Sequence, residues 1–252
     1  MTSLHALIQT LDDWMKPELL KDYAPNGLQV EGRDTISRLA LGVTASADVI
    51  QQAVAWGADA LLVHHGYFWR NEPPVLTGMK GQRVRALMNH QMSLIAYHLP
   101  LDCHAEFGNN KALLDQLGLV GGQPIAEENG LLWSVPLPNA MTIDQLASQV
   151  QSALGRAPMV IESSRGSETL SRLVVCTGGA QDYLTKALYY GADVYLSGEI
   201  SERTTHEARE LGVHYIAAGH HATERYGIQA LGQKLASTLD VDVAFFDDHN
   251  PA

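Results

Sequence analysis

Two adjacent histidines, His64 and His65, follow an apolar run at residues 60–63 and precede Gly66. An apolar run of this kind is typical of a buried strand that ends in a loop. Neighbouring side chains within a strand point to opposite faces, so both imidazoles converge only at a strand end, where Gly66 frees the backbone. Neutral imidazole is a common ligand for Zn, Fe, Ni and Cu. The pair suggests a metal site, although a chance doublet on a loop explains these two residues equally well.

Further polar residues follow other apolar segments. His98 comes directly after the segment at 94–97, and Asp102 lies four residues later. His220 and Glu224 are four residues apart at the expected start of a helix, so they share one helix face. A carboxylate in the first helical turn is also favoured by the helix dipole. The candidate metal ligands are therefore three imidazoles and two carboxylates: His64, His65, Asp102, His220 and Glu224.

Five ligands are more than the three that a single catalytic zinc normally takes from the protein. They fit two ions roughly 3.5–4 Å apart that share a carboxylate. Nitrogen and oxygen ligands without thiolate suit Zn, Mn, Fe or Ni, and we predict two divalent ions of unspecified identity. Each residue also has a structural interpretation. His98 fits a hydrogen-bonded core position, Asp102 fits a turn or helix cap, and Glu224 fits an ion pair on a solvated helix face.

The elements that must position these residues follow from the hydrophobic pattern. Ser3 and the segment Thr142–Gln145 are predicted to begin helices, and Gly57 to end one. We predict strands at 39–43, 59–63, 94–97, 131–135, 173–176, 194–196, 215–218 and 241–246. Helices are predicted at 4–14, 47–56, 82–90, 109–117, 143–154, 181–190, 202–210 and 222–235. Alternating strands and helices predict parallel or mixed sheets covered on both faces, with ligand sites beyond the carboxyl ends of strands.

The sequence contains an internal repeat. Residues 36–39 (ISRL) match 170–173 (LSRL), and residues 57–59 match 191–193 (both GAD), at the same offset of 134 positions. Two matched segments in constant register indicate a duplicated α/β unit. The same offset places Glu199 at the position of His65, so Glu199 is expected to line the same cleft.

Composition narrows the class of protein. A chain of 252 residues with 46% hydrophobic and 18% charged residues describes an ordinary globular protein of one large domain or two smaller ones. The net charge of −11 argues against general binding to nucleic-acid backbones. Cys103 and Cys176 are too few for a disulfide framework or a cysteine zinc site, which favours a reducing cytoplasmic setting. Asp12 and Asp13 interrupt the first apolar segment, so we expect no signal peptide, and no run is long enough for a membrane helix.

Five motifs, in this order over essentially the whole chain, resemble those of the YbgI-like family, the GTP cyclohydrolase 1 type 2 homologues: DYAPNGLQVEG at 22–32, VHHGYFW at 63–69, HLPLD at 98–102, SGEISE at 197–202 and GHHATER at 219–225. The resemblance implies a duplicated fold of two interlinked three-layer α/β domains with mixed sheets and a dinuclear metal site between them. It implies the same five ligands, and a toroidal homohexamer built as a trimer of dimers. We expect residues 1–123 with 220–252 to form the first domain, carrying most of the metal site, and 124–219 to form the second.

The activity that the resemblance implies is hydrolytic opening of the purine ring of GTP, or disposal of damaged nucleotides. Water activated by the ions would attack C8 of the guanine ring, and His98, near the ions but not bound to them, would move the proton. The sequence has no glycine-rich phosphate loop, so ions, a neighbouring subunit or cations such as Arg70, Lys80 and Arg83 would hold a triphosphate. Two alternatives stay open: a metallohydrolase of another class, such as a phosphoesterase or peptidase, and a hexameric metal-binding scaffold or regulatory protein without catalysis.

Overall fold

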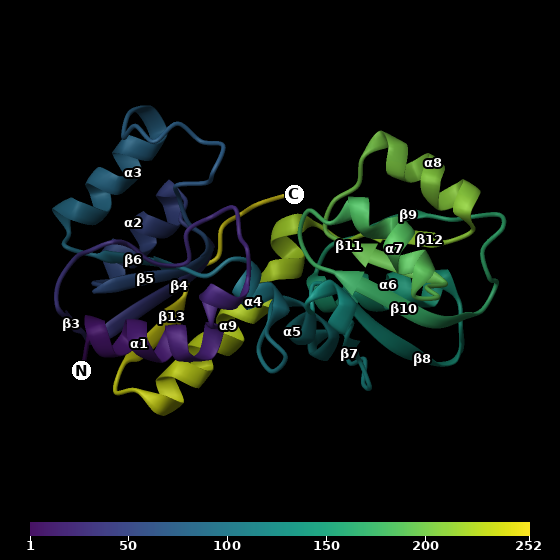
Figure 1. Ribbon diagram of the computed structural model, residues 1–252, viewed down its shortest axis with the longest axis horizontal. Helices are drawn as coiled ribbons and strands as arrows, with labels where there is room; N and C mark the ends of the chain where they lie inside the picture. Colours follow the sequence, from purple (N-terminus) through teal and green to yellow (C-terminus); the bar gives the residue numbers. More distant parts are fainter. The chain divides into compact units, whose positions relative to one another are not determined.

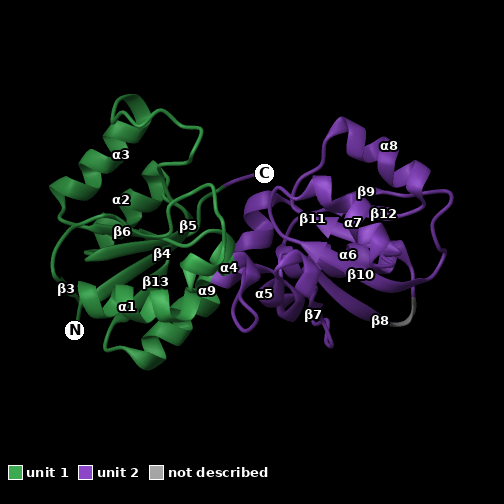
Figure 2. Cartoon of the chain, in the orientation of Figure 1, with its two compact units in different colours: residues 1–101, 228–249 green, residues 102–227, 250–252 purple. Residues whose placement is uncertain are grey.

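The chain divides into two compact units, shown in different colours in Figure 2. Unit 1 comprises residues 1–101 and 228–249, and unit 2 comprises residues 102–227 and 250–252. The computed structural model describes residues 1–137 and 141–252. Two of the three boundaries fall inside helices, α4 (Leu99–Cys103) and α9 (His220–Thr238), and the third lies between residues 249 and 250, outside any helix or strand.

Three segments that we assign to the first domain from the sequence, 102–123, 220–227 and 250–252, lie in unit 2. Apolar side chains explain the placement of the two longer segments. Leu113 and Leu114 of α5 (Asn109–Gln116) and Ala222 at the start of α9 belong to a hydrophobic cluster of unit 2 that includes Trp133. Burial of these side chains therefore fixes both segments to the core of unit 2.

Unit 1 contains a five-stranded sheet in the order β13-β4-β5-β6-β2 (Figure 1). The strands β13, β4, β5 and β6 are parallel, and β2 is antiparallel to β6. A separate pair, β1 and β3, is antiparallel. The bounds are β1 (Thr2–Ser3), α1 (Leu4–Met15), η1 (Pro17–Leu19), β2 (Gly27–Val30), β3 (Thr35–Ile36), β4 (Arg38–Thr44), α2 (Ala47–Trp56), β5 (Ala60–His65), α3 (Gly78–Asn89), β6 (Ser93–Ala96) and β13 (Asp242–Phe245).

Helices cover both faces of this sheet. Figure 1 shows α2 and α3 on one side of the sheet of unit 1 and α1 and α9 on the other. Val49 of α2 and Leu87 of α3 are buried in one cluster with Leu61 and Val63 of β5. On the opposite face, Gly232 lets α9 approach β4 closely, because a Cβ at this position would lie 2.1 Å from the side chain of Leu41. Unit 1 is therefore a three-layer α/β/α structure.

Unit 2 contains a six-stranded sheet in the order β7-β8-β10-β11-β12-β9. The strands β10, β11 and β12 are parallel, and the other pairs are antiparallel. The bounds are β7 (Gln123–Pro124), η2 (Ala126–Glu128), β8 (Trp133–Met141), α6 (Ile143–Leu154), β9 (Met159–Ile161), β10 (Leu170–Cys176), η3 (Gln181–Tyr183), α7 (Leu184–Tyr189), β11 (Val194–Ser197), α8 (Glu202–Leu211) and β12 (His214–Ala217). Leu146 of α6 packs in one buried cluster with Leu196, and Leu184 of α7 packs in another with Tyr195.

The local signals for helix ends are confirmed. The Ser3 side chain accepts a hydrogen bond from the Ala6 amide at 3.1 Å. Thr142 and Gln145 form both bonds of a capping box, and Gly57 ends α2 in the left-handed conformation at φ 77°. The third helix differs from the prediction, since it begins at Gly78 rather than near residue 82.

The duplication predicted from the sequence is visible in the two sheets. The strands β4, β5 and β6 with antiparallel β2 repeat as β10, β11 and β12 with antiparallel β9. The matched aspartates make the same bonds. Asp59 Oδ2 accepts the Ser37 and Arg38 amides at 2.8 and 2.9 Å. Asp193 Oδ2 accepts the amides of Ser171 and Arg172 at 2.7 and 3.0 Å, so each GAD motif fixes the start of a neighbouring strand.

Replacing Asp193 with Asn tests this role. Burial would raise the pKa of Asp193, but hydrogen bonds from Ser171 and Arg172 outweigh it, so the pKa lies below its usual value. A lowered folded-state pKa gives stability that is present above the unfolded pKa and lost as the pH falls through the folded pKa. Because Asp193 is partly exposed, we expect Asp193→Asn to lower the free energy of unfolding by about 1 kcal/mol at pH 7.

Urea denaturation at neutral pH and at about pH 3 measures the effect, which should shrink in acid. The exposed Asp242, at the start of β13, provides the control variant Asp242→Asn, for which no comparable loss is expected. A difference between wild type and Asp193→Asn that grows as the pH falls would contradict the assignment.

Candidate metal centre

Three histidines converge at the carboxyl ends of two neighbouring strands of unit 1. His64 and His65 are the last two residues of β5, and His98 lies two residues beyond β6. The ring centroid of His64 lies 4.4 Å from that of His65 and 5.1 Å from that of His98. Each ring offers one nitrogen, and these nitrogens lie within 4.8 Å of one another, so the three histidines could hold a metal ion.

Protein groups orient the two histidines of β5. The Nδ1 atom of the buried His64 lies 3.0 Å from the backbone oxygen of Tyr97. A carbonyl oxygen only accepts, so Nδ1 carries the proton and the lone pair of the neutral ring lies on Nε2. The Nδ1 atom of His65 lies 3.1 Å from the Thr44 hydroxyl. Such partners on one ring nitrogen are typical of histidines that bind metal through the other.

Asp22 holds His98 and was not among the site residues expected from the sequence. Its Oδ1 lies 2.9 Å from His98 Nδ1, and its Oδ2 accepts the Leu99 amide and the Asn26 side-chain amide, both at 3.0 Å. Burial would raise the pKa of Asp22, but the hydrogen bond and charge of His98, with the bonds from Asn26 and Leu99, hold it well below the usual range. Asp22 is therefore an ionised anchor for the His98 ring. Its membership of the motif at 22–32 is the sequence signal that could have identified it.

Two aromatic rings flank the histidines of unit 1. Trp69 meets His98 edge-on at 4.9 Å between centroids, and Tyr23 meets the same ring at 5.1 Å. Trp69 also lies 6.0 Å from His65. Tyr23 is 51% exposed, so one side of this aromatic pair faces solvent. The arrangement gives the cluster a wall on which a planar ring could stack.

The remaining three candidate ligands lie in unit 2. Asp102 and Glu224 are almost fully buried, at 7% and 3% exposure. A carboxylate oxygen of one lies within 4.8 Å of a carboxylate oxygen of the other. Asp102 Oδ1 accepts a hydrogen bond from Asn109 Nδ2 at 2.8 Å, which fixes the carboxylate. Two buried carboxylates at such a distance repel each other, and a cation between them would relieve the repulsion.

His220 connects Glu224 to a second glutamate. Because α9 begins at His220, the i,i+4 spacing brings His220 Nε2 to 3.2 Å from Glu224 Oε2. On the other side of the ring, His220 Nδ1 lies 2.6 Å from Glu199 Oε1. Burial would lower the pKa of His220, but hydrogen bonds and charge from Glu224 and Glu199 raise it to about 9. A metal ion at Nε2 would therefore compete with a tightly held proton.

The donors in each unit fit a divalent ion by their chemistry. Unit 1 offers three imidazoles, and unit 2 offers one imidazole and two carboxylates. Five of these six side chains, those of the four histidines and Asp102, also have a hydrogen bond to a protein group outside the donor set, the arrangement that orients metal ligands. Nitrogen and oxygen donors of this kind suit Zn, Mn, Fe or Ni.

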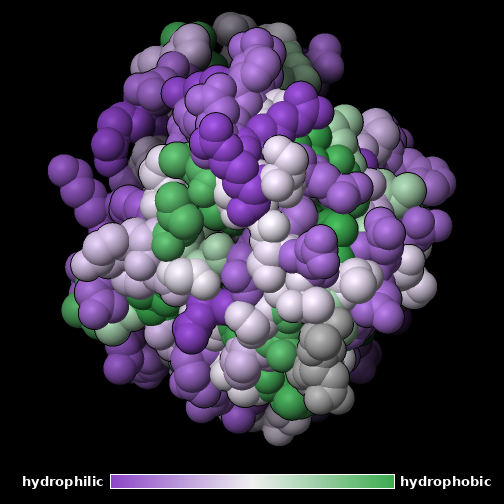
Figure 3. All heavy atoms as spheres, turned by 90° about the vertical axis from the view of Figure 1, so that its right-hand side faces the viewer, coloured by the Kyte–Doolittle hydropathy of each residue, from purple (hydrophilic) through white to green (hydrophobic). Residues whose placement is uncertain are grey.

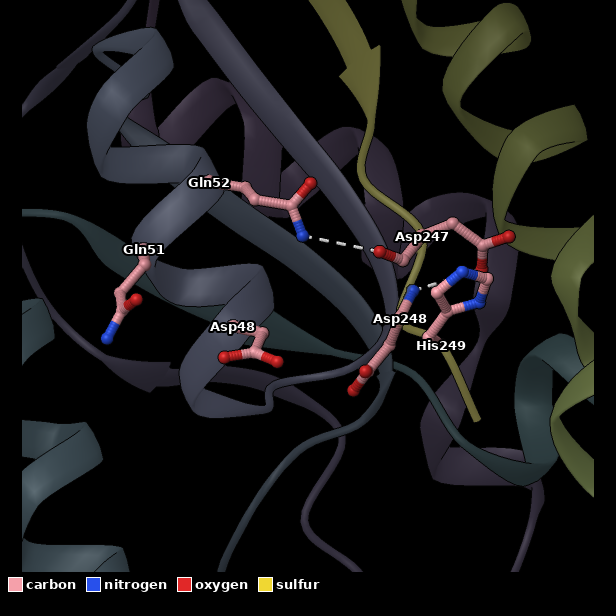
Figure 4. A pocket seen from close by; sticks show the side chains of 6 residues that line it. All are labelled: Asp48, Gln51, Gln52, Asp247, Asp248 and His249. Carbon is pink, nitrogen blue, oxygen red and sulfur yellow. Dashed lines mark hydrogen bonds between the residues drawn. The ribbon is translucent and has the colours of Figure 1, made fainter. Parts of the chain in front are cut away.

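A separate pocket of unit 1 lies beside α2 and the segment that follows β13 (Figure 4). It is lined by Asp48, Gln51, Gln52, Asp247, Asp248 and His249. Gln52 Nε2 donates to the backbone oxygen of Asp247 at 3.3 Å, which ties α2 to this segment. The pocket contains none of the residues predicted to bind metal.

No helix among the described residues combines the length and the apolar character needed to cross a membrane.

Comparisons with known proteins agree along the whole chain. The family model for Duf34/NIF3 (NGG1p interacting factor 3) matches residues 2–251. A protein of Allochromatium vinosum named GTP cyclohydrolase 1 type 2 homolog is 50% identical over 252 residues, which cover 100% of this chain and 98% of the relative. An Escherichia coli K12 relative of the same name is 45% identical over 249 residues, 98% of each chain.

Two solved structures are closely similar. That of protein ybgI, described as of unknown function, has a TM-score of 0.95 and 43% identity, with 100% of both chains covered. A protein from Thermus thermophilus has a TM-score of 0.90 and 30% identity, again over 100% of both chains. Sequence and fold thus agree, and the chain belongs to the Duf34/NIF3 family.

Proposed function

We propose that this protein is a dinuclear metal-dependent hydrolase that opens the purine ring of GTP or of a damaged nucleotide. In this proposal two divalent ions are held by His64 and His65 of unit 1 and by Asp102, His220 and Glu224 of unit 2. The main support is the short spacing of the candidate donor atoms within each unit. In unit 1 the donor atoms of His64 and His65 lie within 4.8 Å of each other, and in unit 2 the donor atom of Glu224 lies within 4.8 Å of those of Asp102 and His220. The name shared by the curated relatives supports GTP as the first substrate to test.

The residues around His98 suit proton transfer. Divalent ions at this site would supply a hydrolytic nucleophile at neutral pH, since they lower the pKa of water toward ~7. His98 Nδ1 is bonded to the Asp22 carboxylate at 2.9 Å, so His98 Nε2 is the nitrogen that can accept and return a proton. The ionised Asp22 holds the ring in one orientation and stabilises the imidazolium that forms when His98 takes up the proton.

The aromatic wall favours a planar substrate. Stacking of a nucleobase on an aromatic side chain contributes about 1–3 kcal/mol. Tyr23 and Trp69 lie beside His98, where a purine could stack next to the proton-transfer group. A phosphodiester or a peptide backbone would make no comparable use of these rings. The aromatic pair therefore supports nucleotide chemistry over the other hydrolase classes.

A non-catalytic scaffold would bind its partners through the protein surface rather than through the buried candidate metal ligands. Figure 3 shows one face of the molecule, on which the hydrophobic patches are separated by hydrophilic side chains. Scattered apolar residues of this kind are ordinary on a protein surface. The homohexamer and the cytoplasmic location stay predictions that rest on family resemblance and composition.

Metal analysis tests the ligand assignment. We expect about two divalent ions per chain in the purified protein. His65→Ala should lower this content because an imidazole is lost from the donor set. His206→Ala is the matched control, since His206 is an exposed histidine paired with Glu202 on α8. Elemental analysis of the three proteins provides the measurement. Equal metal content in wild type and His65→Ala would remove His65 from the ligands.

An activity screen tests the reaction class. Metal-loaded protein is incubated with GTP, damaged nucleotides, phosphodiesters and peptides, and products are separated by chromatography. The proposal predicts ring opening of a purine nucleotide, with activity lost in His65→Ala. Hydrolysis confined to phosphodiesters or peptides would move the protein to another hydrolase class. Inactivity on all substrates, with metal present, would favour the scaffold.

The role of His98 is tested by His98→Ala. The variant should keep its metal content and lose turnover by roughly 10²–10⁴-fold, the usual range for removal of a general acid or base. Metal content and kcat are measured on the same preparation. Retained turnover would remove His98 from the mechanism. Loss of metal would instead make His98 a ligand together with His64 and His65.

A further inference from the structure

Unit 2 has a pocket at the carboxyl edge of its parallel strands. It is lined by ten residues that include Arg156, Met159, Gly198, Glu199 and Gly219. Gly198 directly follows β11, and Gly219 follows β12 by two residues. The antiparallel strand β9 begins at Met159 beside the end of β12, since Met159 pairs with Ala217. Ligand sites of α/β sheets lie at this edge.

The repeat relates this pocket to the histidine cluster of unit 1. At the offset of 134 positions, Gly198 corresponds to His64 and Glu199 corresponds to His65. At the positions equivalent to His64 and His65, unit 2 therefore has a glycine and a carboxylate in place of the two imidazoles.

The sheet register extends the comparison to the next strand. Ala60 pairs with Ser93, and Val194, which lies 134 positions after Ala60, pairs with His214. Ser93 and His214 are therefore equivalent. Gly219 lies five residues after His214, as His98 lies five residues after Ser93, so Gly219 occupies the position of His98.

Both glycines are required by close approaches. A Cβ at Gly198 would lie 2.7 Å from the Gly178 backbone oxygen and from the His220 Cα. Gly219 has φ +101°, and a Cβ there would lie 2.2 Å from Arg156 Nη1. The space that His98 fills in unit 1 is thus taken in unit 2 by the guanidinium of Arg156.

The guanidinium of Arg156 lines the pocket, and its N–H donors have no acceptor in the part of the chain that the structure describes. Among the described residues, no hydrogen bond or ion pair reaches its guanidinium, whereas Arg33 and Arg203 each pair with an aspartate. The nearby Glu199 carboxylate is already bonded to His220 at 2.6 Å. Ala252 also lines the pocket, and its backbone oxygen accepts the His221 amide at 3.2 Å.

We infer that this pocket of unit 2 binds an anionic group of a small molecule, a phosphate or a carboxylate, and that Arg156 recognises it. The planar guanidinium matches either group with two parallel hydrogen bonds. Packing against Gly219 orders the side chain before the ligand arrives, which lowers the entropic cost of binding. The inference concerns unit 2 alone and does not depend on catalysis at the metal centre. Arg156 was not among the cations that we selected from the sequence.

Equilibrium dialysis of the full chain with radiolabelled inorganic phosphate tests the inference. The protein is used as purified and again after treatment with a chelator, so that any contribution of metal ions to phosphate binding is separated. Competition by acetate forms a second arm that distinguishes a carboxylate site from a phosphate site. The variants are Arg156→Gln and Arg156→Lys, with Arg85→Gln as control, because Arg85 is an exposed arginine on α3 of unit 1.

Wild type should bind phosphate saturably in both preparations, and Arg156→Gln should weaken binding by about tenfold or more. Arg156→Lys should bind with intermediate affinity, because it keeps the charge but loses the paired donors. Arg85→Gln should match wild type. Circular dichroism and metal content of each variant should stay unchanged.

Equal phosphate affinity in wild type and Arg156→Gln would overturn the inference, as would the absence of saturable binding by wild type. Loss of binding in Arg156→Gln accompanied by loss of metal or of secondary structure, with Arg156→Lys equal to wild type, would assign Arg156 a structural role instead. None of these outcomes bears on the metal content of wild type, so the proposed hydrolase stands or falls separately.

Discussion

The candidate site depends on the hydrogen bonds by which other protein groups fix the orientation of its side chains. His64 is held by a backbone carbonyl, His98 by the Asp22 carboxylate, and His220 by Glu199. A carbonyl or carboxylate accepts but does not donate, so each of these Nδ1 atoms carries a proton. The Nε2 atom of each ring then points away from this partner. These partners turn flexible imidazoles into oriented donors. Without them, proximity at a strand end would not define a site.

The duplicated fold supplies the positions, and the two copies use them differently. In unit 1 the strand ends carry His64, His65 and His98, and in unit 2 the equivalent positions carry Gly198, Glu199 and Gly219. Imidazoles gather where the backbone leaves room for them. Close backbone approaches exclude a side chain at Gly198, and an arginine takes the place of the third ring beside Gly219. One scaffold therefore provides a cluster of imidazoles at the sheet edge in one copy and a polar pocket in the other.

Much of this architecture could be predicted from the sequence because its signals are local or periodic. The GAD repeat, the capping box at Thr142 and the apolar strands determine the α/β class and the duplication. The adjacent pair His64–His65 and the i,i+4 pair His220–Glu224 indicate donors for the same reason. Asp22 and Arg156 have no such signal for their contacts, because the residues they touch, His98 and Gly219, are more than 60 positions away in sequence, and only membership of the motif at 22–32 points to Asp22. The short edge strands β2 and β9 also lack a clear period, since they have four and three residues.

Anomalous diffraction at the absorption edge of the metal in crystals of the purified protein tests the central claim most directly. The account predicts two peaks roughly 3.5–4 Å apart, coordinated by His64 and His65 from unit 1 and by Asp102, His220 and Glu224 from unit 2. A single peak bound by His64, His65 and His98, with Asp102 and Glu224 uncoordinated, would contradict it.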